Sequence, residues 1–153
     1  MSKYDKLKKL TINNIGLFTL NNKTTIGKVI QVNSPEDFQM IIGLDNVMFR
    51  FHCRLSKSKI ISDKKINYIN KFIDLVTDCS CSNNELSDIE LQKLVDKNEK
   101  LLNVKCGNFD INGNLLVELY EFNNKVSVQE SLTDLKILEK IDDNEGIFKF
   151  NST

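Results

Sequence analysis

The sequence has no tryptophan, a single histidine and four cysteines, and it lacks any long apolar run. No stretch approaches the ~20 consecutive apolar residues that a membrane-spanning helix needs. The first ten residues, MSKYDKLKKL, carry charges but neither the apolar stretch nor the small-residue cleavage site of a secretory signal. We therefore expect an intracellular protein that is not secreted and has no membrane partner.

Few side chains suit metal binding or acid–base chemistry. One histidine limits the general-base options, and no Ser-His-Asp set, Cys-His pair or glycine-rich phosphate loop is present. Without an export signal, all four cysteines, Cys53, Cys79, Cys81 and Cys106, are expected to be reduced. Cys79 and Cys81 have C-x-C spacing and would form a zinc site only together with His52 and Cys53, whereas structural zinc uses C-x₂₋₄-C pairs. We expect no metal and no cofactor.

Charge is balanced in total but not along the chain. The 153 residues contain 21 Lys and Arg and 21 Asp and Glu, so the net charge is zero. Residues 1–59 hold 10 basic and 4 acidic side chains, a charge of +6, and residues 60–153 carry the opposite charge. Such an asymmetry orients an anionic partner, although an uneven solvated surface explains it equally well.

β-Branched and alternating runs predict strands in the first third of the chain. Residues 24–32 and 38–42, separated by the turn formers of NSPED, are expected to form a hairpin, and residues 15–20 an earlier strand. Residues 47–55 alternate, which predicts one core face and one solvent face. The core set is Val47, Phe49, Phe51, Cys53 and Leu55, and the other is Met48, Arg50, His52 and Arg54.

Helical spacing begins after residue 62. Apolar residues predict an amphipathic helix whose stripe packs on the sheet: Ile66, Ile69, Phe72, Ile73 and Val76. Ser87 with Glu90, and Ser127 with Glu130, are capping-box pairs that predict helices to about residue 97 and through residue 140. Residues 101–110 and 114–122 predict a second hairpin with a turn at Asn112-Gly113. Residues 141–153 are expected to be a loose tail.

Three strands, a helix, two strands and a helix are the order of a five-stranded oligonucleotide/oligosaccharide-binding (OB) barrel. The predicted fold class is therefore α+β, mostly β, with two to three helices in one domain over residues 1–153. We expect the core in residues 24–140, an N-terminal extension in 1–23, a helical insertion in 78–98 and the tail in 141–153. A generic α+β sandwich fits the periodicity almost as well.

Four segments carry a resemblance to a known family. In order they are GKVIQVNSPEDF, FRFHCRL, VKCGNFDINGNLLVELY and KVSVQESL. They resemble the staphylococcal-nuclease-like (thermonuclease) family, whose second hairpin has the pattern V-K-C-G-x-F-D-x-x-G-R-x-L-V-E-L-Y, and especially the copies carried by large DNA viruses. The similarity covers roughly residues 24–150. It implies an OB-like barrel of this nuclease type and, for a viral member, a location in the host cytoplasm or the virion.

The resemblance also implies a degenerate active site. Family members cleave phosphodiesters with a calcium ion, a carboxylate beside the attacking water and two arginines on the phosphate. In this chain Lys59 matches a calcium aspartate, Ser62 the base glutamate, and Asn114 the second arginine. An ammonium group cannot ligate calcium, serine cannot take the proton of water at neutral pH, and asparagine offers no cationic fork. No catalytic residue is therefore expected.

The favoured hypothesis is a catalytically inactive nuclease-like fold that binds single- or double-stranded DNA or RNA. Arg54 matches the family's first phosphate arginine, and lysine in place of the calcium aspartate makes the cleft more attractive to phosphate. The expected nucleic-acid-binding residues are Arg50, His52, Arg54, Lys57 and Lys59. In the bland alternative, His52 is a half-exposed strand residue, and Arg50 or Arg54 pairs with Glu118 or Glu121 across the sheet.

Two further functions remain open. The chain is an active calcium-dependent nuclease if Asp63 binds the metal together with Glu36 or Asp37. It is a protein-interaction or structural module of a viral or intracellular assembly if it works like the Tudor-like relatives of this fold. Those relatives use an aromatic cage, and three tyrosines without tryptophan provide no convincing one.

Two acidic features are expected to be structural. Asp110 more simply shapes the turn before Asn112-Gly113 than binds metal. Residues 142–146, DDNEG, lack the regular ligand spacing of a calcium hand and belong to the solvated tail.

Overall fold

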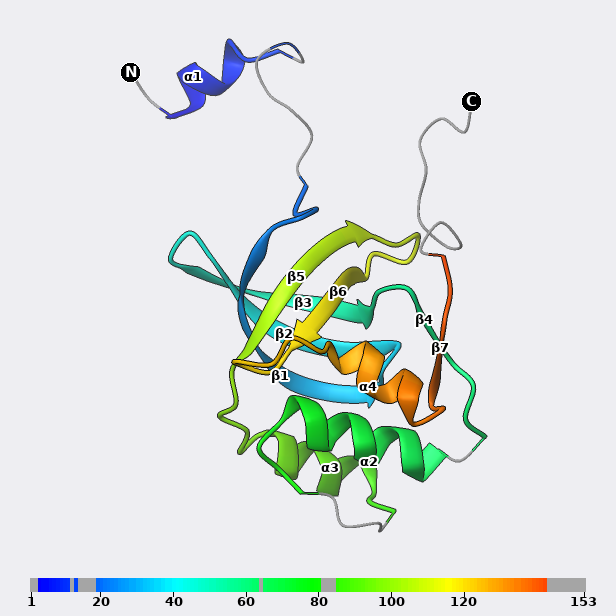
Figure 1. Ribbon diagram of the computed structural model, residues 1–153. Helices are drawn as coiled ribbons and strands as arrows, with labels where there is room; N and C mark the ends of the chain where they lie inside the picture. The colour runs from blue at the N-terminus through cyan, green and yellow to red at the C-terminus, as the bar shows by residue number, and fades with distance from the viewer. Residues whose placement is uncertain (1–2, 12, 14–18, 64, 81–84, 143–153) are drawn as a thin grey trace.

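Five strands close into a barrel in the order β1–β2–β3–β6–β5. The computed structural model describes residues 3–11, 13, 19–63, 65–80 and 85–142. The barrel strands are β1 (Thr24–Ser34), β2 (Asp37–Leu44), β3 (Val47–Leu55), β5 (Leu102–Phe109) and β6 (Leu115–Tyr120). Figure 1 shows helices α2 (Lys65–Val76) and α3 (Asp88–Val95) stacked at one side of the barrel, next to β1. The predicted α+β class and the five-stranded barrel are confirmed.

Antiparallel pairing joins all neighbouring strands except one pair. β3 and β6 run parallel and pair over only three positions, from Cys53 opposite Leu115 to Leu55 opposite Val117. The β2–β3 hairpin turns at Asp45-Asn46, whose φ angles of 50° and 68° are both left-handed. Two such residues make the tight turn whose twist matches that of the flanking strands. Both predicted hairpins, β1–β2 and β5–β6, are confirmed.

The core fills the barrel and extends under the first long helix. Phe38 of β2 packs on Phe72 of α2 with ring centroids 5.1 Å apart, and both side chains are fully buried. The apolar stripe of α2 therefore covers one mouth of the barrel, as its periodicity predicts. Of the predicted stripe, the Ile66 side chain lies outside the described part of the structure.

One buried amide fastens the segment after α3 to the barrel. The Asn98 side chain is 1% exposed, and its Nδ2 donates to the carbonyl of Val29 on β1 at 3.1 Å. Its Oδ1 accepts from the backbone N–H groups of Asp78 and Lys100, both at 3.0 Å. Because Asp78 precedes α3 and Lys100 precedes β5, a single side chain ties both ends of the insertion to β1.

The capping predictions have different outcomes. At α3 the full capping box is present: Ser87 Oγ accepts from Glu90 N, and Ser87 N donates to Glu90 Oε1. Ser127 likewise caps α4 (Val128–Asp134). The prediction that this helix runs through residue 140 is wrong, because Lys136 takes a left-handed φ of 60°. The chain then extends as β7 (Leu138–Lys140), which buries Ile137 and Leu138 in the core.

A second, two-stranded sheet joins distant parts of the chain. β4 (Ser58–Ile60) pairs antiparallel with β7, and Lys59 lies opposite Glu139. β4 is not among the strands predicted from the sequence. Figure 1 shows this small sheet beside the barrel, with α4 between it and the other helices.

Two further expectations need correction. A short N-terminal helix, α1 (Lys3–Lys8), was not predicted. Val47 and Phe49, predicted as core, are about half exposed because the β2–β3 hairpin projects beyond the barrel. Residues 15–18 of the predicted first strand and residues 143–153 of the tail, including most of DDNEG, lie outside the described residues. Among the described helices, none is long and apolar enough to cross a membrane.

Candidate functional site

The cationic residues predicted on β3 do share its outer face. Arg50, His52 and Arg54 alternate with residues that point inward, as the period-two pattern requires. Arg54 Nη2 contacts Glu36 Oε2 at 2.9 Å and the carbonyl of Ser58 at 3.4 Å. This contact ties the end of β3 to the β1–β2 turn and places a carboxylate directly against the guanidinium.

The expected alternative partners of these arginines are wrong. Glu121 instead forms an ion pair with Lys100 Nζ at 2.9 Å. Glu118 accepts a hydrogen bond from the hydroxyl of Tyr120 at 3.0 Å. Arg50 Nε instead donates to Gln39 Oε1 at 2.5 Å, and Gln39 Nε2 donates to Gln31 Oε1 at 2.6 Å. A ladder of polar side chains thus crosses β3, β2 and β1.

A short cationic row crosses the same outer face. Lys28 on β1 pairs in register with Ile41, which in turn lies opposite Arg50, and His52 lies opposite Gln39. Arg50 and His52 are exposed. Cationic groups therefore stand on both outer strands of this three-stranded face.

Lys57 and Lys59 lie beyond this face. Lys57 occupies the turn after β3 with a φ of 54°, and Lys59 lies on β4. Glu139 opposite Lys59 and Glu36 against Arg54 add negative charge to this end. The five predicted nucleic-acid-binding residues are therefore divided between two places, and their role stays a prediction.

Asp110 organises the β5–β6 turn, which confirms the structural role expected for it. Its carboxylate accepts from Asn112 N at 2.9 Å, from Asn114 N at 2.8 Å and from Asn114 Nδ2 at 3.1 Å. Gly113 supplies the left-handed φ of 84° that the turn needs. The side chain of Asn114 is thus part of the turn itself, whereas Ser62 follows β4 and Lys59 lies within it.

The acidic residues of the nuclease alternative have other partners. Glu36 contacts Arg54, and Asp37 Oδ2 accepts from Asn33 Nδ2 at 3.0 Å. Asp63 is exposed beyond β4. Within the described ranges, no three His, Cys, Asp or Glu side chains gather closely enough to hold a metal ion.

The cysteines imagined as zinc ligands do not converge where the structure describes them. Cys53 is buried inside the barrel, where burial and the neighbouring Cys106 raise the pKa of its thiol well above the ordinary value. Cys79 follows α2 and its thiol contacts the carbonyl of Leu94 at 3.0 Å. Cys81 lies outside the described residues.

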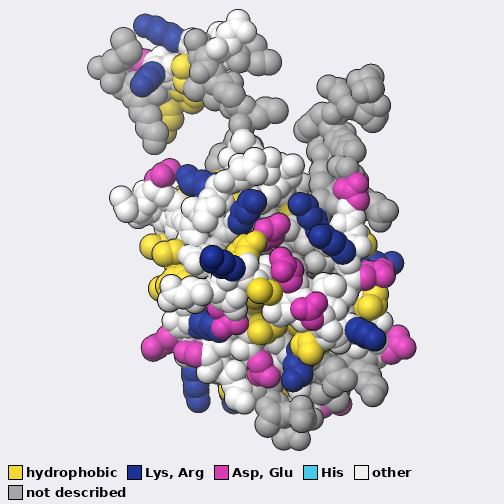
Figure 2. Space-filling model, viewed as in Figure 1, with side chains coloured by type: hydrophobic (Ala, Val, Ile, Leu, Met, Phe, Trp, Pro, Cys, Tyr) yellow, Lys and Arg dark blue, Asp and Glu magenta, His cyan; other side chains and the backbone are white. Residues whose placement is uncertain are grey.

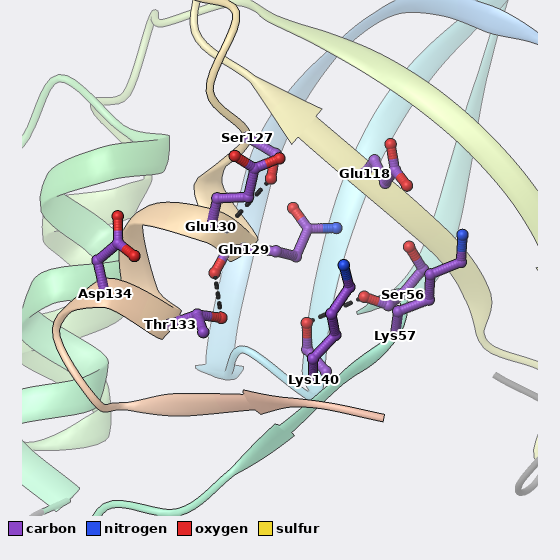
Figure 3. Close-up of a pocket in the computed structure, with 10 residues that line it drawn as sticks. Ser56, Lys57, Glu118, Ser127, Gln129, Glu130, Thr133, Asp134 and Lys140 are labelled. Atoms are coloured by element: carbon purple, nitrogen blue, oxygen red, sulfur yellow. Dashed lines mark hydrogen bonds between the residues drawn. The ribbon is translucent and has the colours of Figure 1, made fainter. Parts of the chain in front are cut away.

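A pocket of about 400 Å³ opens between β6, α4 and the β4–β7 sheet. Gln129 forms its floor, donating to the carbonyl of Val117 at 2.8 Å and accepting from Leu119 N at 3.3 Å. The charged lining residues are Lys57, Glu118, Glu130, Asp134 and Lys140, shown in Figure 3. Figure 2 shows acidic and basic side chains interspersed on this face.

The pocket beside β6 has few groups for catalysis. Its lining includes neither histidine nor cysteine, so a conventional base–nucleophile pair is missing from it. Burial, and then the hydrogen bond to Glu118, raise the pKa of Tyr120 next to the pocket, which keeps its hydroxyl protonated.

An exposed apolar surface lies elsewhere, on the outer face where the β2–β3 hairpin meets β1 and the entry to β5. We call it the hairpin surface; its exposed apolar members are Ile26 (47% exposed), Met48 (69%) and Leu101 (47%). Figure 2 shows hydrophobic side chains at the edge of the molecule where Figure 1 places this hairpin. The sequence did not predict this surface. Alternating apolar and polar residues predict which face of a strand is buried, but they do not predict which part of the strand lies beyond the end of the barrel.

A shallow groove of about 790 Å³ forms part of the hairpin surface. Ile26, Ile41, Met48 and Leu101 line it, with Gly43 in between. Gly43 on β2 has no side chain, and the Met48 side chain packs over it. Lys28, Thr24, Thr25 and Asn103 complete the lining, so the groove is open and mostly apolar, with one cationic side chain.

No protein-family model and no curated protein matches the chain. Among solved structures, the extended Tudor domain of human TDRD1, in complex with a symmetrically dimethylated peptide, is similar with 14% sequence identity. The match covers 79% of this chain and 92% of that one, with a TM-score of 0.38. Likeness at this level is too weak for an inference about function. The resemblance to the nuclease-like family stays a prediction.

Proposed function

We propose that this chain is a protein-binding module and that its partner docks on the hairpin surface. The supporting observation is the gathering of Ile26, Met48 and Leu101 around one groove, each about half exposed or more. Large contiguous exposed apolar patches mark interaction sites on proteins. Methionine and aromatic side chains are also enriched in protein–protein interfaces.

We further propose that the chain lacks nuclease activity. Lysine, serine and asparagine stand at positions 59, 62 and 114, where the family resemblance implies a metal ligand, a base and a phosphate arginine. The remaining arginine, Arg54, has Glu36 at 2.9 Å. A phosphate would have to compete with that carboxylate for the guanidinium.

A peptide library tests the binding proposal. Random peptides displayed on phage are selected on the immobilised chain, and enriched peptides are measured on the wild type, Met48→Asp and the control Ile89→Asp. Ile89 is 70% exposed on α3, so the control introduces the same charge at an equally exposed apolar side chain. We expect Met48→Asp to weaken the enriched peptides more than about tenfold and Ile89→Asp to leave them unchanged. Enriched peptides that bind all three proteins equally, or the absence of enrichment, would remove the hairpin surface from the proposal.

Nucleic acid is the second candidate partner, favoured by the cationic side chains of Lys28 and Arg50, with His52 next to Arg50 on the same face. Its test is a fluorescence-anisotropy titration with single- and double-stranded DNA at two salt concentrations, with and without calcium, each endpoint run on a gel. Phosphate binding predicts affinity that falls with salt, and intact DNA. Replacing Lys28 and Arg50 by alanine should flatten that salt dependence. Affinity unaffected by salt would exclude this candidate, and calcium-dependent fragments would contradict the proposed lack of nuclease activity.

A further inference from the structure

β3 has two edges, and only one of them is paired along its whole length. β2 lies opposite every residue from Val47 to Cys53, whereas pairing with β6 starts at Cys53. Among the described residues, no strand pairs with residues 47–51 on the β6 side. β3 is therefore paired with β6 at its C-terminal end, whereas the same edge of residues 47–51 is open.

Hydrogen bonds at the end of β3 identify which backbone groups face the open side. Leu55 N donates to Pro35 O, on the β2 side, and Ser56 N donates to Val117 O of β6. Successive residues of a strand direct their N–H and C=O groups to opposite edges. Even-numbered residues therefore face away from β2, so Met48 and Arg50 direct their backbone donors and acceptors at the open edge.

This edge is accessible and partly apolar. Met48, Phe49 and Arg50 are exposed, and Val47 is 51% exposed beside them. On the inner side, Phe49, Phe51 and Phe109 follow one another with ring centroids 6.3 Å apart at each step. An exposed strand edge with apolar neighbours is a template for another strand.

The charged side chains on the outer face of β3 determine which kind of strand can pair with its open edge. In a symmetric antiparallel pairing centred on residue 49 or 50, two copies of this chain place their Arg50 side chains directly opposite or one diagonal step apart. Like charges so close in neighbouring strands are destabilising, and the two His52 side chains stand next to them. The outer face thus disfavours a second copy and favours a strand with acidic side chains.

We propose that an extended peptide segment of another protein adds to the open edge of β3 as a further strand of the sheet. The segment alternates acidic side chains, which face Arg50 and His52 on the outer side, with apolar side chains that pack on Phe49 and Phe51. This inference rests on the proposed protein-binding function and names the partner's chemistry. At ~3.3 Å per residue, residues 47–51 accommodate about five peptide residues.

A synthetic peptide of alternating Glu and Val, labelled with fluorescein, tests this mode by anisotropy. Its controls are a Lys-Val peptide, a peptide of the same composition with all Glu before all Val, and two peptides N-methylated on either the Glu or the Val residues. We expect the Glu-Val peptide to bind about tenfold or more tighter than the Lys-Val and block peptides. One N-methylated set should lose binding and the other keep it, because only one set faces β3.

Two changes in the protein complete the test. Arg50→Glu with His52→Glu should weaken the Glu-Val peptide and strengthen the Lys-Val peptide, whereas Lys93→Glu with Lys105→Glu should leave their order unchanged. Both lysines are exposed, on α3 and β5. Bound peptide should also slow amide hydrogen exchange at Met48 and Arg50 more than about tenfold, and not at Phe49, whose N–H faces β2.

The outcomes separate this inference from the function on which it rests. If both N-methylated peptides bind equally, or the amides of Met48 and Arg50 stay unprotected, strand addition is wrong. Peptides that remain sensitive to Met48→Asp would then still support docking on the hairpin surface. Concentration-dependent self-association that protects the same amides would make a second copy the occupant and would overturn the assignment to an acidic peptide.

Discussion

Replacing Asn98 by alanine should destabilise the whole domain, because this residue joins the helical insertion to the barrel. The side chain is 1% exposed and makes three hydrogen bonds, to the Val29 carbonyl and from the N–H groups of Asp78 and Lys100. Replacement by alanine leaves all three of these backbone groups without the side chain that they bond. Each buried polar group left without a partner costs roughly 1–3 kcal/mol.

The three losses are not equal. The Val29 carbonyl loses its bond in a buried place, so the upper half of that range, about 2 kcal/mol, applies to it. Asp78 is exposed and Lys100 half-buried, so water replaces part of the loss at their N–H groups, and about 0.5 kcal/mol each is reasonable. The expected loss of unfolding free energy is therefore about 3 kcal/mol, equivalent to a fall in Tm of about 6–12 °C for a domain of this size.

Urea denaturation followed by circular dichroism measures this loss, with Asn112→Ala as the matched control. Asn112 is exposed in the β5–β6 turn, so its replacement should change stability by no more than about 0.5 kcal/mol. Amide exchange in α3 should accelerate in Asn98→Ala before the barrel strands open. A loss below about 1 kcal/mol, or equal losses in the two variants, would refute the role given to this amide.

Three further outcomes follow from the structure. Asp110→Ala should lower the unfolding free energy by about 2–3 kcal/mol, because the carboxylate accepts three hydrogen bonds, and Asp110→Asn by less; equal losses in urea denaturation would contradict this reasoning. Burial raises the pKa of Cys53 and Cys106. In a variant with Cys79→Ser and Cys81→Ser, these two thiols should therefore react with a thiol reagent at pH 8 only in denaturant. Rapid reaction of both thiols in the native protein would show that the barrel is open. Burial and Glu118 also raise the pKa of Tyr120. The stability contributed by this protonated hydroxyl is complete below the ordinary pKa near 10 and is lost as pH rises through the folded-state pKa, so Tyr120→Phe should flatten the loss of stability above pH 10 in urea titrations; an unchanged slope would exclude this linkage.

Sequence patterns predicted those elements whose signal lies within one short stretch of residues. The alternation of residues 47–55 matches β3 from end to end, and Ser87 with Glu90 marks the start of α3. β4 and β7 gave no such signal, since three-residue strands are too short for a period and each depends on a partner far away in the sequence. The helix expected through residue 140 ends early because Ile137 and Leu138 are buried only when the chain turns at Lys136.

The candidate site was predicted less well, for the same physical reason. Alternation placed Arg50, His52 and Arg54 on one face, but it could not show that Glu36 from another part of the chain contacts Arg54. It also assigned Val47 and Phe49 to the core, because a sequence does not tell how far a hairpin extends beyond the barrel that it helps to form. The exposure of these two side chains thus depends on the lengths of the strands relative to one another.

The parallel contact between β3 and β6 also has a consequence for synthesis on the ribosome. β1, β2 and β3 are contiguous and can pair as soon as they emerge, but β1 closes onto β5 and β3 onto β6, at residues beyond 100. Until those strands are made, the nascent three-stranded sheet has two open edges and an uncovered apolar inner face. Such an intermediate is prone to association with other chains. The charge of Arg50 and the polar side chain of His52, on the outer face of β3, then act as gatekeepers in the period before the barrel closes.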